Sequence, residues 1–277
     1  MNFEIRISKF ETNSNFQYPN FLNKDFIRTF RIGLFEIVSN FGFRASNLYA
    51  VSWKRRRATL DTLRFVRKYT MTWIKICGIT CPEDALWAAS LEVNALGFIF
   101  APSPRRVEPD AARKIIETVP GNLLKVGVFV DEDRSEVERV LKYCGLTAVQ
   151  FHGNESPESC RGFSAPVFKA LHIKDAQSLA AMDEYRDVSL MLDTYSPVKA
   201  GGTGIAFPLE IALAARKKRN FVLSGGLNPS NVGEAVRRVR PLGVDVCSGV
   251  ERIPGRKDRS STIAFVEEVR KADETAG

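Results

Sequence analysis

The sequence has few of the residues from which metal centres and disulfide frameworks are built. It contains only two histidines, His152 and His172, and its five cysteines are odd in number and show no framework spacing. With no convincing secretory leader, such cysteines indicate reduced thiols, so we expect a cytoplasmic protein. Cys77 and Cys81 lie four residues apart, but a metal site needs further ligands, and the histidines form no motif with them. The sequence therefore predicts neither disulfides nor a metal site.

The sequence also lacks an apolar run long enough to cross a membrane. The longest run near the N-terminus, residues 32–43, is interrupted by Glu36 and Asn40. A membrane-spanning helix needs about 20 mostly apolar residues. We therefore expect no membrane partner.

An excess of positive charge is present, but only in one part of the chain. The net charge is +8, and residues 1–70 alone hold 13 Lys and Arg against 5 Asp and Glu, which leaves 27 of each sign in the remainder. The same 70 residues hold 10 of the 19 phenylalanines and none of the cysteines. The composition thus divides the chain into a basic, Phe-rich extension, residues 1–70, and a neutral domain, residues 71–277.

Three interpretations of residues 1–70 compete. An organelle-targeting leader fits the Arg-rich second half, but the acidic residues Glu4, Glu11, Asp25 and Glu36 argue against it. A nucleic-acid-binding arm would rest on one basic cluster, Trp53 to Arg57, which is weak evidence. Upstream sequence outside the working protein fits best, because Met71 directly precedes the first convincing strand. We therefore expect residues 1–70 to be poorly ordered or not part of the native protein, and we expect no nucleic-acid partner.

From Met71 onward, strand-like and helix-like segments alternate with short connections, as βα units require. The strands are apolar rather than alternating, as expected when both faces of a sheet are buried. The predicted strands are 73–77, 95–100, 125–130, 148–151, 167–170, 189–193, 221–224 and 243–246, and the predicted helices are 82–91, 109–119, 135–144, 157–161, 176–185, 209–216, 229–239 and 261–271. Eight units in about 200 residues predict an α/β fold, a single closed (β/α)8 TIM barrel. A doubly wound open sheet is the alternative, but eight even repeats favour closure.

Polar residues and glycines follow the predicted strands, where barrels place their chemistry. Gly225, Gly226, Ser248 and Gly249 follow the last two strands, where backbone N–H groups bind phosphate in barrels of the phosphate-binding type. Asp245, within the last strand, is placed to orient that loop. A glycine pair also occurs in ordinary tight turns, so this pattern gains its meaning from its position after those two strands.

Cys77 and Asp193 form the ionisable pair of the predicted mouth. A thiolate can accept a proton and a carboxylic acid can donate one, if burial and neighbouring groups tune their pKa values. The structural alternatives are a buried apolar thiol for Cys77 and a strand-end turn residue for Asp193. His152 is either part of the site or a hydrogen-bonded structural imidazole. Arg105 is placed to pair with a substrate carboxylate through its planar fork.

An ordered set of motifs covering nearly all of residues 71–271 resembles phosphoribosylanthranilate isomerase. The motifs are Lys75-Ile-Cys-Gly-Ile-Thr80, Ala95-Leu-Gly-Phe98, Val126-Gly-Val-Phe-Val130, Gln150-Phe-His-Gly153, Leu192-Asp-Thr194, Gly201-Gly-Thr-Gly204, Ser224-Gly-Gly-Leu-Asn-Pro229 and Val244-Asp-Val-Cys-Ser-Gly-Val-Glu251. The resemblance implies an Amadori rearrangement in tryptophan biosynthesis, with a phosphosugar substrate, no cofactor, and a monomer or homodimer. It further implies that Cys77 is the general base, that Asp193 is the general acid and that Arg105 holds the anthranilate carboxylate. The glycines of the last two loops match the family's phosphate site.

The chain departs from the family pattern at two places that concern the site. Residues 205–209 read Ile-Ala-Phe-Pro-Leu where the family usually has Lys-Thr-Phe-Asp-Trp, and Cys247 stands where the family usually has serine. Neither change removes the acid or the base, so we expect activity. The alternatives are a non-catalytic phosphosugar-binding barrel and the sister Amadori isomerase of histidine biosynthesis. The sister enzyme uses two aspartates, and a thiol at Cys77 argues against it.

Overall fold

A computed structural model describes residues 71–91, 93–194 and 207–275 of the chain. The predictions for residues 1–70 and for positions 205 and 206 lie outside these described residues. In the part that is described, no helix is both long and apolar enough to cross a lipid bilayer.

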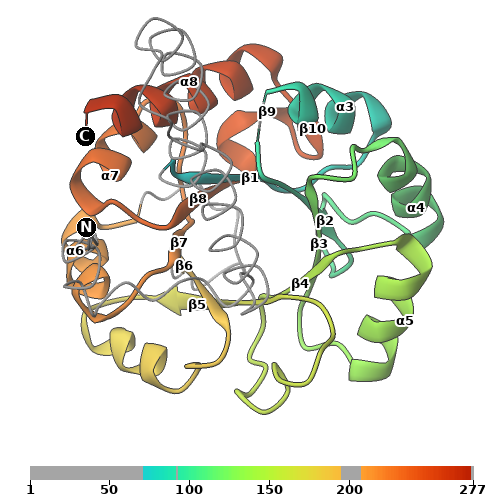
Figure 1. The fold of residues 1–277 in the computed structure, drawn as a ribbon, viewed down its shortest axis with the longest axis horizontal. Coiled ribbons are helices and arrows are strands. Elements are labelled where there is room, and N and C mark those ends of the chain that lie inside the picture. The colour runs from blue at the N-terminus through green and yellow to red at the C-terminus, as the bar shows by residue number, and fades with distance from the viewer. Residues whose placement is uncertain (1–70, 92, 195–206, 276–277) are drawn as a thin grey trace, which may run out of the picture.

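Eight parallel strands close into a barrel in sequence order, with β1 paired to both β2 and β8 (Figure 1). The strands are β1 (Trp73–Ile76), β2 (Ala95–Ile99), β3 (Leu124–Phe129), β4 (Ala148–Phe151), β5 (Val167–Ile173), β6 (Ser189–Thr194), β7 (Val222–Leu223) and β8 (Gly243–Val246). The predicted TIM barrel is confirmed, and the open sheet is excluded.

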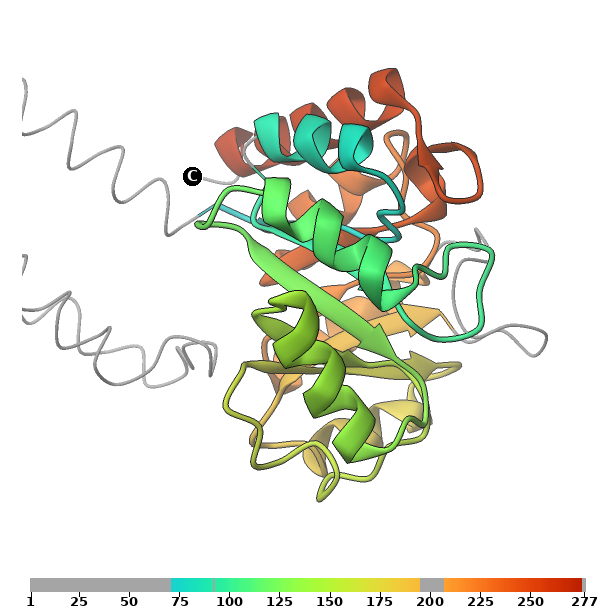
Figure 2. The same cartoon turned by 90° about the vertical axis from the view of Figure 1, so that its right-hand side faces the viewer.

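Helices surround this ring on the outside (Figure 1). They are α3 (Pro82–Ser90), α4 (Pro109–Thr118), α5 (Arg134–Cys144), α6 (Leu209–Lys218), α7 (Val232–Val239) and α8 (Arg259–Thr275). Proline opens α3 and α4, where its fixed φ suits the first helical turn. Figure 2 shows α3 (teal), α4 (green) and α5 (yellow-green) lying side by side across the outer face of the strands.

Two predicted helices are wrong in type. Residues 157–161 form turns, because five residues are too few to sustain an α-helix and Gly162 adopts a φ of +76° directly after them. Residues 177–183 form a 3-10 helix, η1 (Gln177–Asp183). A short antiparallel pair, β9 (Glu251–Ile253) and β10 (Arg256–Lys257), was not predicted; it follows the 3-10 helix η2 (Ser248–Val250) after β8.

The interior of the barrel changes from apolar to polar toward the carboxyl ends of the strands. A small cluster of buried apolar residues fills the lower part, and Trp73 stacks on Phe168 with ring centroids 5.6 Å apart. Because side chains alternate along a strand, every second residue points inward. The inward positions read Trp73, Lys75, Cys77 from β1; Ala148, Gln150, His152 from β4; Phe168, Ala170, His172 from β5; and Met191, Asp193 from β6. This gradient places the ionisable side chains at one mouth.

Candidate active site

Cys77 directly follows β1 and is buried, with 5% of its surface exposed. Its backbone N–H donates to the Val246 carbonyl at 2.8 Å, which continues the β1–β8 ladder by one residue. Gly97 of β2 leaves the space that the thiol occupies, because a Cβ on Gly97 would lie 2.6 Å from Cys77 Sγ. Three neighbouring strands thus fix the position of this side chain.

The surroundings of Cys77 favour its thiolate form. A hydrogen bond from Cys247 and the positive charge of Lys75 outweigh the effect of burial and lower the pKa of Cys77 from 9.0 to about 6. Lys75 is fully buried, and its Nζ lies 2.8 Å from Asp245 Oδ1, so it stays charged beneath the thiol. The hydrogen bond with Cys77, together with burial, raises the pKa of Cys247, so Cys77 carries the negative charge of the pair. The site therefore holds a nucleophilic or basic sulfur near neutral pH.

Asp193 lies in β6, on another side of the same mouth, and is 3% exposed. Its Oδ2 lies 3.1 Å from His152 Nε2, and its Oδ1 accepts the Thr194 backbone N–H at 2.8 Å. Burial alone would raise the pKa of Asp193, but His152, His172 and the Thr194 N–H together lower it below its ordinary value. The structure thus brings two residues singled out in the sequence, Asp193 and His152, into direct contact.

His172 is a member of this cluster that the sequence did not indicate. It is the register partner of Asp193 in the β5–β6 ladder, and its Nε2 lies 3.2 Å from the His152 carbonyl oxygen. The two imidazoles meet edge to face, with ring centroids 5.0 Å apart. The predicted strand ended at Ala170, three residues before the observed end of β5. A β5 extended to Ile173 would have placed His172 on the inward face.

The loops after β7 and β8 pack against each other and against the acid. Gly225 and Gly226 adopt φ values of +85° and +62°, and a Cβ on Gly225 would lie 2.3 Å from Thr194 Oγ1. A Cβ on Gly249 would lie 1.9 Å from the Leu227 carbonyl oxygen, so the two loops touch through their backbones. Within the described part of the chain, no hydrogen bond uses the backbone N–H of Gly225, Gly226 or Ser248. These N–H groups are suited to an anion.

Arg105, in the loop after β2, is held by Glu251, whose role the sequence pattern did not indicate. Its Nε donates to both carboxylate oxygens of Glu251, at 3.0 and 2.9 Å, and its Nη2 donates to Oε2 at 2.8 Å. Lys257 Nζ also binds Glu251, at 3.0 Å. The β9–β10 hairpin supplies Glu251 and Lys257, so this small element fixes the arginine at the rim.

Asp245 has contacts that differ from those expected of a loop-orienting residue. Its carboxylate lies inside the barrel, paired with Lys75, and its Oδ2 accepts a hydrogen bond from Ser224 Oγ at 3.3 Å. Ser224 leads into the loop after β7, so among the described residues Asp245 contacts that loop through this hydroxyl. Its main partner is the lysine beneath Cys77.

Comparison with known proteins places this geometry in a family. The family model of N-(5'-phosphoribosyl)anthranilate isomerase matches residues 74–268. The isomerase of Desulforudis audaxviator is 47% identical over 204 residues, which cover 73% of this chain and 100% of the relative. The isomerase of a Geobacter species (strain M21) is 48% identical over 202 residues, covering 73% and 99%.

Solved structures agree with these relatives. The crystal structure of the Thermotoga maritima phosphoribosylanthranilate isomerase covers 73% of this chain and 100% of its own, with a TM-score of 0.69 and 40% identity. A structure of such an isomerase in complex with reduced 1-(o-carboxyphenylamino)-1-deoxyribulose 5-phosphate has a TM-score of 0.66, 39% identity and the same coverage. The residues matched by the family model include Cys77, directly after β1, and Asp193 in β6. The chain belongs to the N-(5'-phosphoribosyl)anthranilate isomerase family.

Proposed function

We propose that the protein converts N-(5'-phosphoribosyl)anthranilate to 1-(2-carboxyphenylamino)-1-deoxyribulose 5-phosphate, a step of L-tryptophan biosynthesis. The proposal rests on one observation. Cys77, a thiol with a lowered pKa, directly follows β1, and Asp193, a buried carboxylate, lies near the end of β6. Only β7 and β8 separate β6 from β1 in the ring. The glycine-rich loops of β7 and β8 therefore lie between base and acid. The related isomerase that was crystallised with a reduced 1-(o-carboxyphenylamino)-1-deoxyribulose 5-phosphate supports a substrate of this kind.

Asp193 is the general acid of the proposed reaction. It protonates the furanose ring oxygen, the bond from C1' to that oxygen breaks, and the anilino nitrogen donates its electron pair to form an iminium with C1'. Asp193 has a lowered pKa before substrate binds, so it must gain a proton first. The phosphate and carboxylate of the substrate are negative charges, which raise the pKa of a nearby carboxyl group. His152, in contact with Asp193, is placed to exchange that proton.

Cys77 is the general base of the second step. Its thiolate removes the proton from C2', and the electron pair left on C2' neutralises the iminium and gives an enolamine. Tautomerisation of the enolamine yields the ketone. Hydrogen is redistributed within one molecule, so the reaction has no net oxidation or reduction.

Two further groups position the substrate in this proposal. The backbone N–H groups of Gly225, Gly226, Ser248 and Gly249 hold the phosphate. Arg105 holds the anthranilate carboxylate with the edge of its guanidinium that faces away from Glu251, since Glu251 occupies Nε and Nη2. Asp245 acts on the site from below, by fixing Lys75 and Ser224.

The test uses phosphoribosylanthranilate generated in the assay, with the loss of anthraniloyl fluorescence followed against the uncatalysed rate. We expect activity in the full chain and in a shortened chain beginning at Met71, since the family match begins at residue 74. Cys77→Ala and Asp193→Asn should each lower kcat by about 10²- to 10⁴-fold. Cys144→Ala is the matched control, because this buried thiol lies on α5, outside the mouth. Folded full-length protein without activity would refute the proposal and leave a phosphosugar-binding barrel.

The subunit state is a further part of the proposal. One related structure is described as monomers generated from the dimeric Thermotoga maritima isomerase. For this chain we keep the prediction of a monomer or homodimer, and sedimentation velocity on the full chain distinguishes the two.

A further inference from the structure

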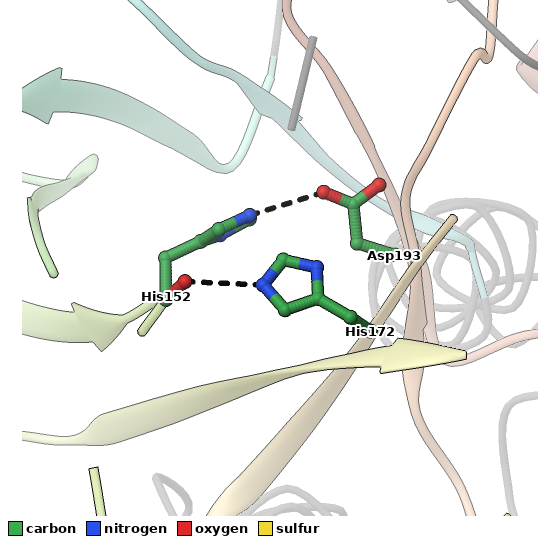
Figure 3. A group of neighbouring side chains, drawn as sticks. All are labelled: His152, His172 and Asp193. Atoms are coloured by element: carbon green, nitrogen blue, oxygen red, sulfur yellow. Dashed lines mark hydrogen bonds and ion pairs between the residues drawn. The ribbon is translucent and has the colours of Figure 1, made fainter. Parts of the chain in front are cut away.

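Three side chains of metal-ligating type converge at the mouth of the barrel. His152, His172 and Asp193 come from the ends of three consecutive strands, β4, β5 and β6, and their nearest ligand atoms all lie within 4.8 Å of one another. Figure 3 shows His152 Nε2 facing a carboxylate oxygen of Asp193, with the His172 ring beside both residues. Two imidazoles and one carboxylate form a donor set typical of Zn²⁺, with a fourth position left open.

The outer contacts of His172 prepare it as a ligand. The His152 carbonyl oxygen can only accept a hydrogen bond, so the His172 Nε2 that lies 3.2 Å from it carries the proton. The lone pair of a neutral His172 then resides on Nδ1, on the side of the ring that faces Asp193 (Figure 3). A ligating histidine that donates its other N–H to a carbonyl is the usual arrangement at metal sites.

The outer contacts of His152 have the same character. Its Nδ1 lies 2.9 Å from the side-chain amide of Gln150, and its Nε2 faces Asp193. Gln150 Oε1 is buried and has no hydrogen-bond partner among the described residues. Turning the Gln150 amide by half a rotation sets Oε1 against His152 Nδ1–H, which satisfies the oxygen and directs the lone pair of Nε2 into the cluster. This buried amide oxygen, which has no partner among the described residues, is an observation independent of the cluster itself.

The spacing of the cluster is close to that of a bound ion. In a tetrahedral zinc site with metal–ligand distances near 2.0–2.1 Å, ligand atoms lie roughly 3.3 Å apart. His152 Nε2 and Asp193 Oδ2 already lie 3.1 Å apart. The widest separation in the cluster, within 4.8 Å, has to shrink by about 1.5 Å, which small side-chain rotations accomplish.

We propose that His152, His172 and Asp193 bind one borderline divalent cation, such as Zn²⁺ or Co²⁺, and that this cation inhibits the enzyme. The inhibition rests on the proposed function: a metal-bound Asp193 can no longer deliver a proton, and a metal-bound His152 can no longer exchange one. The cation is an inhibitor and takes no part in turnover. His172 takes part in no proton-transfer step of the proposed mechanism and acts only through the charge environment of Asp193, so its removal tests the site.

The test uses the full chain, first treated with chelator, and titrates it with ZnCl₂ by calorimetry and with CoCl₂ by visible absorption. We expect one ion per chain and the absorption of a tetrahedral nitrogen–oxygen site. His172→Leu should weaken binding by about 100-fold or more, since it removes one of three ligands, and His172→Asn is the second variant if the first fails to fold. Cys81→Ser is the matched control and should bind as the parent does.

Activity measurements connect binding to inhibition. We expect Zn²⁺ to inhibit the parent and Cys81→Ser alike, chelator to restore activity, and His172→Leu to resist inhibition. Equal binding and inhibition in the parent and His172→Leu, or a thiolate-to-cobalt absorption band, would assign the metal to cysteine and overturn the proposal. A chain that binds Co²⁺ at the nitrogen–oxygen site but has no isomerase activity would refute the proposed function and retain the metal site. Normal turnover without metal binding would refute the metal site and retain the proposed function.

Discussion

Substitution of Cys247 by alanine should shift the pH at which the protein becomes active. The hydrogen bond from Cys247 is the largest single influence on the pKa of Cys77, and it stabilises the thiolate. The lowering from 9.0 to about 6 corresponds to roughly 4 kcal/mol in favour of the thiolate. A hydrogen bond to a charged group contributes about 1.5–3 kcal/mol of this, so its loss should raise the pKa of Cys77 to roughly 7–8.

The sign follows from the role of the base. Protonated Cys77 cannot remove the C2' proton, so kcat/KM should fall as the pH drops below the pKa of Cys77. The loss of activity on the acid side should lie near pH 6 in the parent and near pH 7–8 in Cys247→Ala, while the loss on the alkaline side, where Asp193 gives up its proton, should be the same in both. Cys247→Ser keeps a hydrogen-bond donor and should stay close to the parent. Cys144→Ala, far from the mouth on α5, should not differ from the parent.

Two assays measure the shift independently. The fluorescence assay gives kcat/KM against pH, and the rate of iodoacetamide alkylation at Cys77, followed by peptide mass spectrometry, reports its thiolate directly. A Cys247→Ala variant that becomes active at the same pH as the parent, with an unchanged alkylation profile, would refute the reasoning that Cys247 tunes the base.

The remaining predictions concern stability and the phosphate loop. Asp245→Asn leaves Lys75 charged and buried without its partner, which should lower the free energy of unfolding by about 3–5 kcal/mol; calorimetry should show a Tm lower by roughly 6–20 °C, and an unchanged Tm would contradict the prediction. Gly225→Ala places a Cβ 2.3 Å from Thr194 Oγ1 at a φ of +85°, so steady-state kinetics should show KM rising more than kcat falls. Gly121→Ala is its control, since nothing lies within 4 Å of the added Cβ, and equal kinetics for the two variants would argue against a loop that is fixed by Gly225.

The barrel could be predicted from sequence because its strands are buried on both faces. Apolar runs of four to six residues between helical patterns are a strong local signal, and the observed β4 and β8 have the predicted bounds. The failures occurred where local pattern and tertiary context differ. Residues 157–161 contain helix formers but too few of them, and the extension of β5 to Ile173 depends on its pairing with β6 rather than on its own composition.

The candidate site was only partly predictable. Cys77 and Asp193 could be predicted because each stands at the end of a strand, and each strand can be identified from its own local sequence. The sequence did not indicate Lys75, Glu251 or His172 as site residues. Their roles depend on contacts with side chains from distant strands and loops, which local sequence does not show. Cys247 was noted only as a small change near the phosphate loop, because its contact with Cys77 spans 170 positions of the chain and exists only once the ring is closed.

Closure of the ring between β1 and β8 therefore does more than complete the fold. The register pairs Lys75 with Asp245 and, one layer higher, brings Cys77 beside Cys247. A buried ion pair often contributes less stability than an apolar pair of similar size. Here the pair holds a positive charge directly beneath a thiol in a water-poor interior, where charge interactions are strong. The β1–β8 junction that closes the barrel is therefore also the structure that keeps Cys77 ionised. The stability lost by burying the Lys75–Asp245 ion pair is thus linked to the reactivity of the thiol.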